Sequence, residues 1–167
     1  MFLIALALAA AEPPSPPPRP MRVEVTRDTI SDDVNATATL QDGNAKLTLT
    51  CDPDDYRGVR VIFTSQHWLA GNSFFTGERP LLYRFDEEHP VRRIWIMRDR
   101  GARLSGRDRV TRFLRGLIDA ERLLFRTRDI EDHPVDVTFR IVGARPAVEQ
   151  LLGACGEQRM RRRLFGG

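Results

Sequence analysis

Residues 45–51 read AKLTLTC, and their alternation decides the fold class of this chain. Leu47, Leu49 and Cys51 occupy every second position, with a lysine and two threonines between them. A period of two is typical of a strand with one face in the core and the other toward solvent. The stretch therefore predicts a half-buried strand that carries Cys51 on its apolar face.

Strand-like segments recur on both sides of this one. They are 21–28, 34–42, 59–65, 81–88, 91–98, 121–129 and 135–143. Asp42-Gly43-Asn44 predicts a hairpin turn before 45–51, because Asp-Gly accepts the positive φ angles of tight turns. Residues 53–58 predict another turn, and 66–80 lack a clear period and predict a long loop or an edge strand.

Two segments late in the chain have a helical period instead. Across 105–120, apolar residues recur at steps of three and four, as in a helix with one core-facing stripe. Ser105 and Asp108 resemble a capping box at the start of this helix. Arg145-Pro146 opens a second helix, since proline suits the first helical turn. The chain thus predicts a mainly β (α+β) fold, an antiparallel β-sandwich or curled sheet with two late helices packed on it.

Cys51 and Cys155 are the only cysteines of the chain. The strand period places Cys51 in the core, and the helical period places Cys155 on the buried stripe of the second helix. In an exported protein two such cysteines predict a disulfide between them. The alternative is two separate buried thiols that pack as small apolar side chains.

The N-terminus favours export to a periplasmic or secreted location. Residues 1–11 resemble a signal peptide, with an apolar run that is too short for a membrane span of about 20 residues. No lysine or arginine precedes the run, so a buried or disordered tail is the alternative. Residues 12–20 hold six prolines and predict an extended linker. A β-rich domain over 21–157 and a basic disordered tail over 158–167 complete the predicted organisation.

The positive charge is concentrated in that tail. The formal net charge of the chain is +3, and the four arginines of RMRRR (159–163) exceed it alone. A nucleic-acid-binding domain carries its positive charge on the fold itself, so we expect no nucleic-acid partner. The alternative, contact of 159–163 with a membrane or a nucleic acid, predicts strongly salt-sensitive binding.

The sequence lacks the usual motifs of metal, nucleotide and nucleophile chemistry. His67, His89 and His133 are far apart, and no CxxC, HxxxH, GxSxG, GxGxxG or GxxxxGK pattern occurs. The sequence therefore predicts no catalytic residue, no metal ligand and no cofactor.

The remaining candidate site is a recognition surface. Arg84 and Asp86 lie two residues apart on a predicted strand and so share one face. His67 and Trp68 lie in the aperiodic segment, which also holds two phenylalanines. Exposed aromatic side chains beside charge are typical of a partner surface. The alternative for Arg84 and Asp86 is an ordinary surface ion pair.

The order of several segments resembles a group of known proteins. The segments are SDD (31–33), the strand ending at Cys51, YRFD (83–86), RIWIM (93–97), FLRGLIDAERLLFR (113–126), FRIVG (139–143) and LLGAC (151–155). Together they resemble small exported proteobacterial envelope proteins, including type VI secretion-associated VasI/TagO-like proteins. The resemblance implies a periplasmic β-rich domain with one structural disulfide, which matches Cys51 with Cys155, and no catalytic residue.

These observations predict a non-catalytic binding or accessory protein of the cell envelope. Its expected partner is another envelope protein, and no integral membrane span is expected. The alternative is a periplasmic hydrolase whose site is assembled only in the fold. A pocket that holds Arg84, Asp86 and a histidine would favour the hydrolase, whereas an exposed Trp68 would favour the binding protein.

Overall fold

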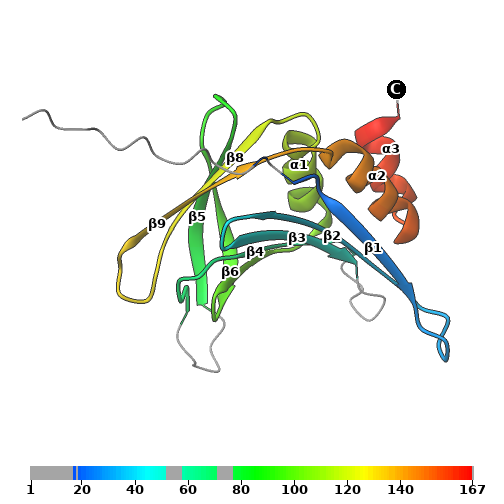
Figure 1. Cartoon of the computed structure of the whole chain (residues 1–167), viewed down its shortest axis with the longest axis horizontal. Coiled ribbons are helices and arrows are strands. Elements are labelled where there is room, and N and C mark those ends of the chain that lie inside the picture. Colours follow the sequence, from blue (N-terminus) through cyan, green and yellow to red (C-terminus); the bar gives the residue numbers. More distant parts are fainter. Residues whose placement is uncertain (1–16, 18, 52–57, 71–76, 167) are drawn as a thin grey trace, which may run out of the picture.

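The structure is a computed structural model that describes residues 17, 19–51, 58–70 and 77–166. One antiparallel sheet makes up most of it (Figure 1). Its strands are β1 (Arg22–Arg27), β2 (Val34–Asp42), β3 (Ala45–Cys51), β4 (Arg60–Thr64), β5 (Gly77–Phe85), β6 (Val91–Arg98), β7 (Gly101–Leu104), β8 (Arg122–Arg128) and β9 (Pro134–Arg140). The helices are α1 (Arg107–Leu117), α2 (Ala144–Ala154) and α3 (Gln158–Phe165). The predicted fold class, a mainly β fold with late helices, is confirmed.

Several predicted features lie outside the described residues. They are the signal peptide at 1–11, most of the linker at 12–20, and most of the turn at 53–58. No helix in the described part of the chain is long and apolar enough to cross a membrane.

The sheet is curled rather than split into two layers. Its strand order is β1-β2-β3-β4-β7-β6-β5-β8-β9, so β1 and β9 are the two edges. The edges approach each other where the Met21 backbone N–H donates to the Val142 carbonyl at 2.8 Å. Beside this bond, the guanidinium and the backbone N–H of Arg140 both donate to the Asp42 carboxylate at the end of β2. Of the two predicted forms, the structure is therefore the curled sheet.

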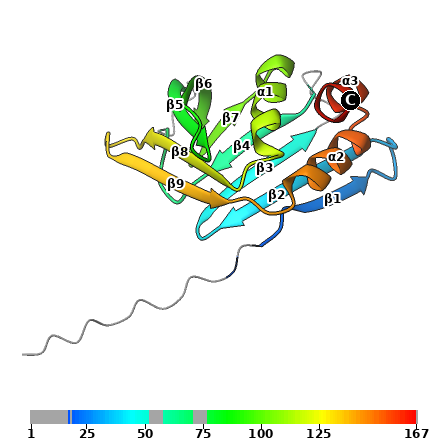
Figure 2. The same cartoon turned by 90° about the horizontal axis from the view of Figure 1, so that it is seen from above.

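The core lies between the inner face of the sheet and the helices, which gather on one side of the molecule (Figure 2). β3 shows how the alternation builds it, because Leu47, Leu49 and Cys51 are buried while the residues between them are not. An aromatic cluster fills the centre. Phe113 of α1 contributes to it, with its ring centroid 5.2 Å from that of Tyr83 and 5.9 Å from that of Trp95.

The disulfide between Cys51 and Cys155 is present, as predicted, with Cα atoms 5.9 Å apart. It joins the last residue of β3 to the residue that follows α2. The bridge therefore fixes the late helices to the first half of the sheet.

Two local predictions about the helices are wrong. The N-cap of α1 is Gly106, and no side chain caps the helix, so Ser105 and Asp108 do not form a capping box. Residues 158–165 are not a disordered tail but form α3, which packs against α1 and α2. Its buried Met160 explains this packing, and Arg161 strengthens it by donating to Glu149 of α2 at 2.8 Å.

Candidate recognition groove

The structure does not bring the four predicted surface residues together at one point. Arg84 is half-buried on the outer face of β5, opposite to the buried Tyr83 and Phe85. Asp86 follows the end of that strand and has a φ of 43°, which turns the chain away. The expectation that Arg84 and Asp86 share a strand face is therefore wrong, and no ion pair joins these two described residues.

Asp86 holds the backbone together instead. Its carboxylate accepts hydrogen bonds from the backbone N–H groups of Glu121 at 3.1 Å and Arg122 at 2.8 Å. Glu121 lies between α1 and β8, and Arg122 is the first residue of β8, the neighbour of β5 in the sheet. The side chain predicted for recognition thus has a structural role.

His67 and Trp68 lie in the segment after β4, at the edge of the β8–β9 turn. The Trp68 carbonyl accepts a hydrogen bond from the Ile130 N–H of that turn at 2.9 Å. The Trp68 side chain is 40% exposed, and the Arg100 guanidinium lies 4.9 Å from its ring centroid. His67 is exposed, with its ring 3.4 Å from the Gln66 amide nitrogen.

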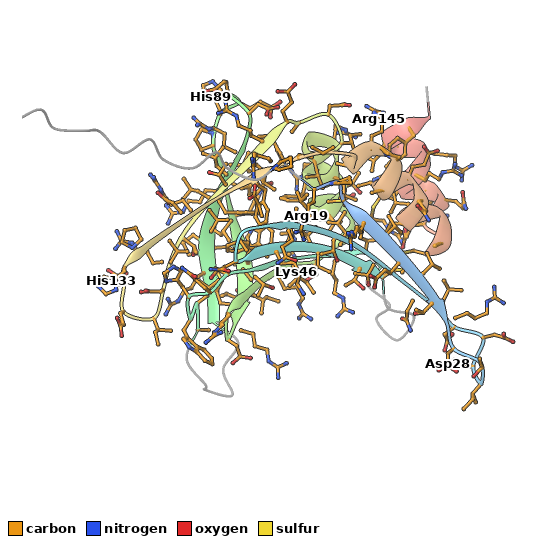
Figure 3. The ribbon with its side chains drawn as sticks, viewed as in Figure 1. Arg19, Asp28, Lys46, His89, His133 and Arg145 are labelled. Carbon is orange, nitrogen blue, oxygen red and sulfur yellow. A yellow bond between two sulfur atoms is a disulfide. The ribbon has the colours of Figure 1, made fainter. Side chains whose placement is uncertain are left out.

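A groove runs along the outer face of β5 and β8. It consists of two adjoining hollows of about 520 Å³ and 440 Å³ that share Leu82 and Arg126. The first hollow reaches the β8–β9 turn and the second reaches the β5–β6 turn, on which Figure 3 labels His133 and His89. We call it the arginine groove, after the arginines in its lining: Arg79, Arg84, Arg92, Arg126 and Arg128.

Two of these arginines are already paired. Arg126 donates to both carboxylate oxygens of Asp136, at 2.7 Å and 2.6 Å. This hydrogen-bonded pair raises the pKa of Arg126 and lowers the pKa of the Asp136 carboxyl. Arg128 donates to the Asp132 carboxylate at 3.0 Å and to the Asp132 carbonyl at 2.7 Å.

Arg84 and Arg92 have no carboxylate partner among the described residues, and Arg79 donates only to the Asp129 carbonyl, at 3.5 Å. The Asp129 carboxylate faces its own turn, where it accepts the backbone N–H groups of Glu131 and His133. Burial alone would raise the pKa of that carboxyl, but these hydrogen bonds and the charge of His133 lower it.

The charges of the groove therefore do not cancel. Five arginines line it against three aspartates, namely Asp129, Asp132 and Asp136. All three carboxylates are engaged by the contacts given above. The groove thus offers an excess of positive charge, and its free donors can bind anionic groups.

Leucine side chains lie directly beside the two unpaired arginines. In the ladder between β5 and β6, Leu82 is opposite Arg92. In the ladder between β5 and β8, Arg84 is opposite Leu124. Both leucines are half-buried on the outer face, so each lies where a ligand can cover it.

Sequence reasoning missed Arg92 and Arg126. The alternation of the predicted strands places both arginines on the outer face. The sequence does not show that β6 and β8 pair with β5, and this pairing brings Arg92 and Arg126 together. Within the described residues, no cluster of three histidine, cysteine, aspartate or glutamate side chains could hold a metal ion. Comparisons of the chain with protein-family models, curated proteins and solved structures find no match.

Proposed function

We propose that this chain is an exported, non-catalytic binding or accessory protein of the cell envelope that recognises its partner through the arginine groove. The observation that carries the proposal is the pair Arg84 and Arg92, two cations with no carboxylate partner among the described residues, beside the half-buried Leu82 and Leu124. A concave surface with a few convergent polar groups on an apolar lining is the usual form of a binding site.

Trp68 supports the same function. Trp68 lies next to the groove, because its carbonyl accepts a hydrogen bond from the backbone N–H of Ile130, which lines the first hollow. Ile130 is itself 50% exposed. Exposed aromatic and aliphatic side chains beside arginine are the composition of a protein–protein contact surface.

The hydrolase alternative gains no comparable support. That alternative requires Arg84, Asp86 and a histidine in one pocket, whereas the Asp86 carboxylate accepts hydrogen bonds from two backbone N–H groups. Among the described residues that line the groove there is no histidine, serine or cysteine. The lining of the groove thus lacks a serine or cysteine nucleophile with an adjoining histidine base.

The proposed location rests on the cysteines and the N-terminus. The Cys51–Cys155 bridge is compatible with an oxidising compartment, and the apolar run within 1–11 suits export. The resemblance to small proteobacterial envelope proteins, among them VasI/TagO-like proteins, supports an envelope partner. A role beside a type VI secretion apparatus is the finer form of this proposal.

Site-specific photo-crosslinking in living cells tests the function. A photo-reactive amino acid replaces Thr138, an exposed residue of the second hollow beside Leu124, in one variant and Arg159 in the control. Arg159 is exposed on α3, and α3 lies far from the β8–β9 turn in both views of the fold (Figures 1 and 2). Because this variant keeps Arg84 and Arg92, we expect one discrete protein adduct from position 138 and none from position 159. Equal labelling at both positions, or none at either, would contradict a binding role of the groove.

A further inference from the structure

The arginine groove is long and open. Along β8 it extends from Arg128 to Leu124, which at about 3.3 Å per residue corresponds to roughly 13 Å. An extended peptide of four to five residues has this length. A compact ligand would leave part of such a groove uncovered.

The lining repeats the same pair of chemical groups. Leu82 lies beside Arg92 in one cross-strand row, and Leu124 lies beside Arg84 in the next. Leu82 and Leu124 are diagonal neighbours on adjacent strands, which places their backbones about 7–8 Å apart. Two residues of an extended peptide cover a similar distance of about 6.7 Å.

From this repeat we infer that the ligand of the arginine groove is an extended segment of a partner protein in which acidic and apolar side chains alternate. The inference rests on the binding function proposed above. In each row a carboxylate meets the unpaired arginine, and the neighbouring apolar side chain covers the leucine. Alternate side chains of an extended peptide point to opposite sides. A peptide that runs diagonally from the Arg92–Leu82 pair to the Arg84–Leu124 pair therefore directs its acidic side chains toward the arginines on its β6 side and its apolar side chains toward the leucines on its β8 side.

A polyanion without apolar groups fits less well. Phosphate polymers and acidic saccharides would pair with Arg84 and Arg92 but would leave Leu82 and Leu124 uncovered. Burial of apolar surface adds about 25 cal/mol per Å² to binding, so the leucines favour a ligand that carries side chains of their own kind. The contribution of the leucines therefore separates the two classes of ligand.

Titration calorimetry with the full chain and defined probes tests the inference. The probe is a synthetic octapeptide of alternating glutamate and leucine. The comparison ligands are the glutamine–leucine octapeptide, the glutamate–serine octapeptide and inorganic polyphosphate. We expect saturable binding of the glutamate–leucine peptide, and dissociation constants at least fivefold higher for both other peptides.

Variants of the protein assign the binding to the groove. Exposed ion pairs contribute up to about 1 kcal/mol each, which corresponds to roughly fivefold in affinity. We expect Arg84→Gln and Arg92→Gln each to weaken the peptide by about this factor, and the double variant by about twentyfold. Arg159→Gln removes the same charge from α3 and should leave binding unchanged. Thermal unfolding of every variant checks that the fold is retained.

Three results would overturn the inference. Tighter binding of polyphosphate than of the glutamate–leucine peptide, or equal binding of the glutamate–serine peptide, would identify a polyanion-binding groove and leave the binding function standing. Absence of saturable peptide binding would reject this ligand class, while crosslinking at position 138 would still decide the binding function. Equal weakening by Arg159→Gln would show that the peptide senses only the net charge of the protein.

Discussion

Gly116 lies one residue before the end of α1, where the helix contacts β5. A Cβ atom at this position would overlap sterically with the edge of the Phe85 ring, with the ring carbon Cγ at 3.1 Å and Cδ2 and Cε2 closer still. Two other aromatic rings restrict the movement of the Phe85 ring. Its side chain is buried, and its centroid lies 5.3 Å from that of Phe113 and 5.7 Å from that of Tyr83. We therefore predict that Gly116→Ala destabilises the protein.

Two opposing effects set the size of the change. Alanine is favoured over glycine in a helix by about 1 kcal/mol. Extra atoms in a well-packed core cost about 1–3 kcal/mol, and the overlap with Phe85 places Gly116 at the upper end of that range. The expected loss in the free energy of unfolding is about 2 kcal/mol.

Gly153→Ala in α2 provides a matched control, because no atom lies within 4 Å of a Cβ built at Gly153. Because Gly153 also lies one residue before the end of its helix, we expect this control to stabilise the protein by about 1 kcal/mol through helix propensity alone. Urea unfolding followed by tryptophan fluorescence measures both changes, since Trp95 is fully buried. The combination of Gly116→Ala with Phe85→Leu should recover at least about 1 kcal/mol relative to additivity. Stabilisation by Gly116→Ala equal to that of the control would refute the packing of α1 on β5.

Three further predictions concern the disulfide and two carboxylates. Replacing Cys51 and Cys155 by serine should lower the free energy of unfolding by roughly 3–4 kcal/mol. The bridge spans 104 residues, for which the chain-entropy model gives about 4.7 kcal/mol, and measured values are often lower than the model value. An unchanged urea midpoint would contradict this stabilising role of the disulfide. Asp86→Ala should cost about 1–2 kcal/mol through two lost backbone hydrogen bonds, whereas Asp86→Asn, which keeps an acceptor, should cost clearly less in thermal unfolding. Hydrogen bonding to Arg126 lowers the pKa of the Asp136 carboxyl from its ordinary value of 3.8. The Asp136–Arg126 pair therefore stabilises the protein fully above pH 3.8, and this contribution is lost as the pH falls below that value. Asp136→Asn should flatten the acid limb of the curve of unfolding free energy against pH, and an unchanged acid limb would contradict the pairing.

The fold was largely predictable because its strands are half-buried. Alternation located all the strands that are long enough to show a period. The alternation did not predict β7, because Gly101–Leu104 has only four residues, or the start of β5, because Pro80 interrupts the pattern. α3 was missed for a different reason. Its four arginines suggested a solvated tail, although Met160, Leu164 and Phe165 pack against the core.

The site was only partly predictable. The sequence placed Arg84 and Trp68 outside the core, and the structure shows Arg84 half-buried and Trp68 40% exposed. Their role in recognition stays a prediction. The sequence pattern misjudged Asp86, because a period of two assumes that the strand continues, whereas the positive φ of Asp86 ends it. The groove itself depends on which strands lie beside β5. That pairing is set by the packing of the whole sheet, so no local pattern reveals it.

The central proposal is that this chain is an exported binding domain with one structural disulfide. Thiol trapping in the cells that naturally make the protein, combined with fractionation, tests it most directly. The expected product carries no alkylated cysteine before reduction, two after reduction, and is found outside the cytosol. A cytosolic product with Cys51 and Cys155 both alkylated without reduction would contradict the bridge, the location and the proposed envelope partner together.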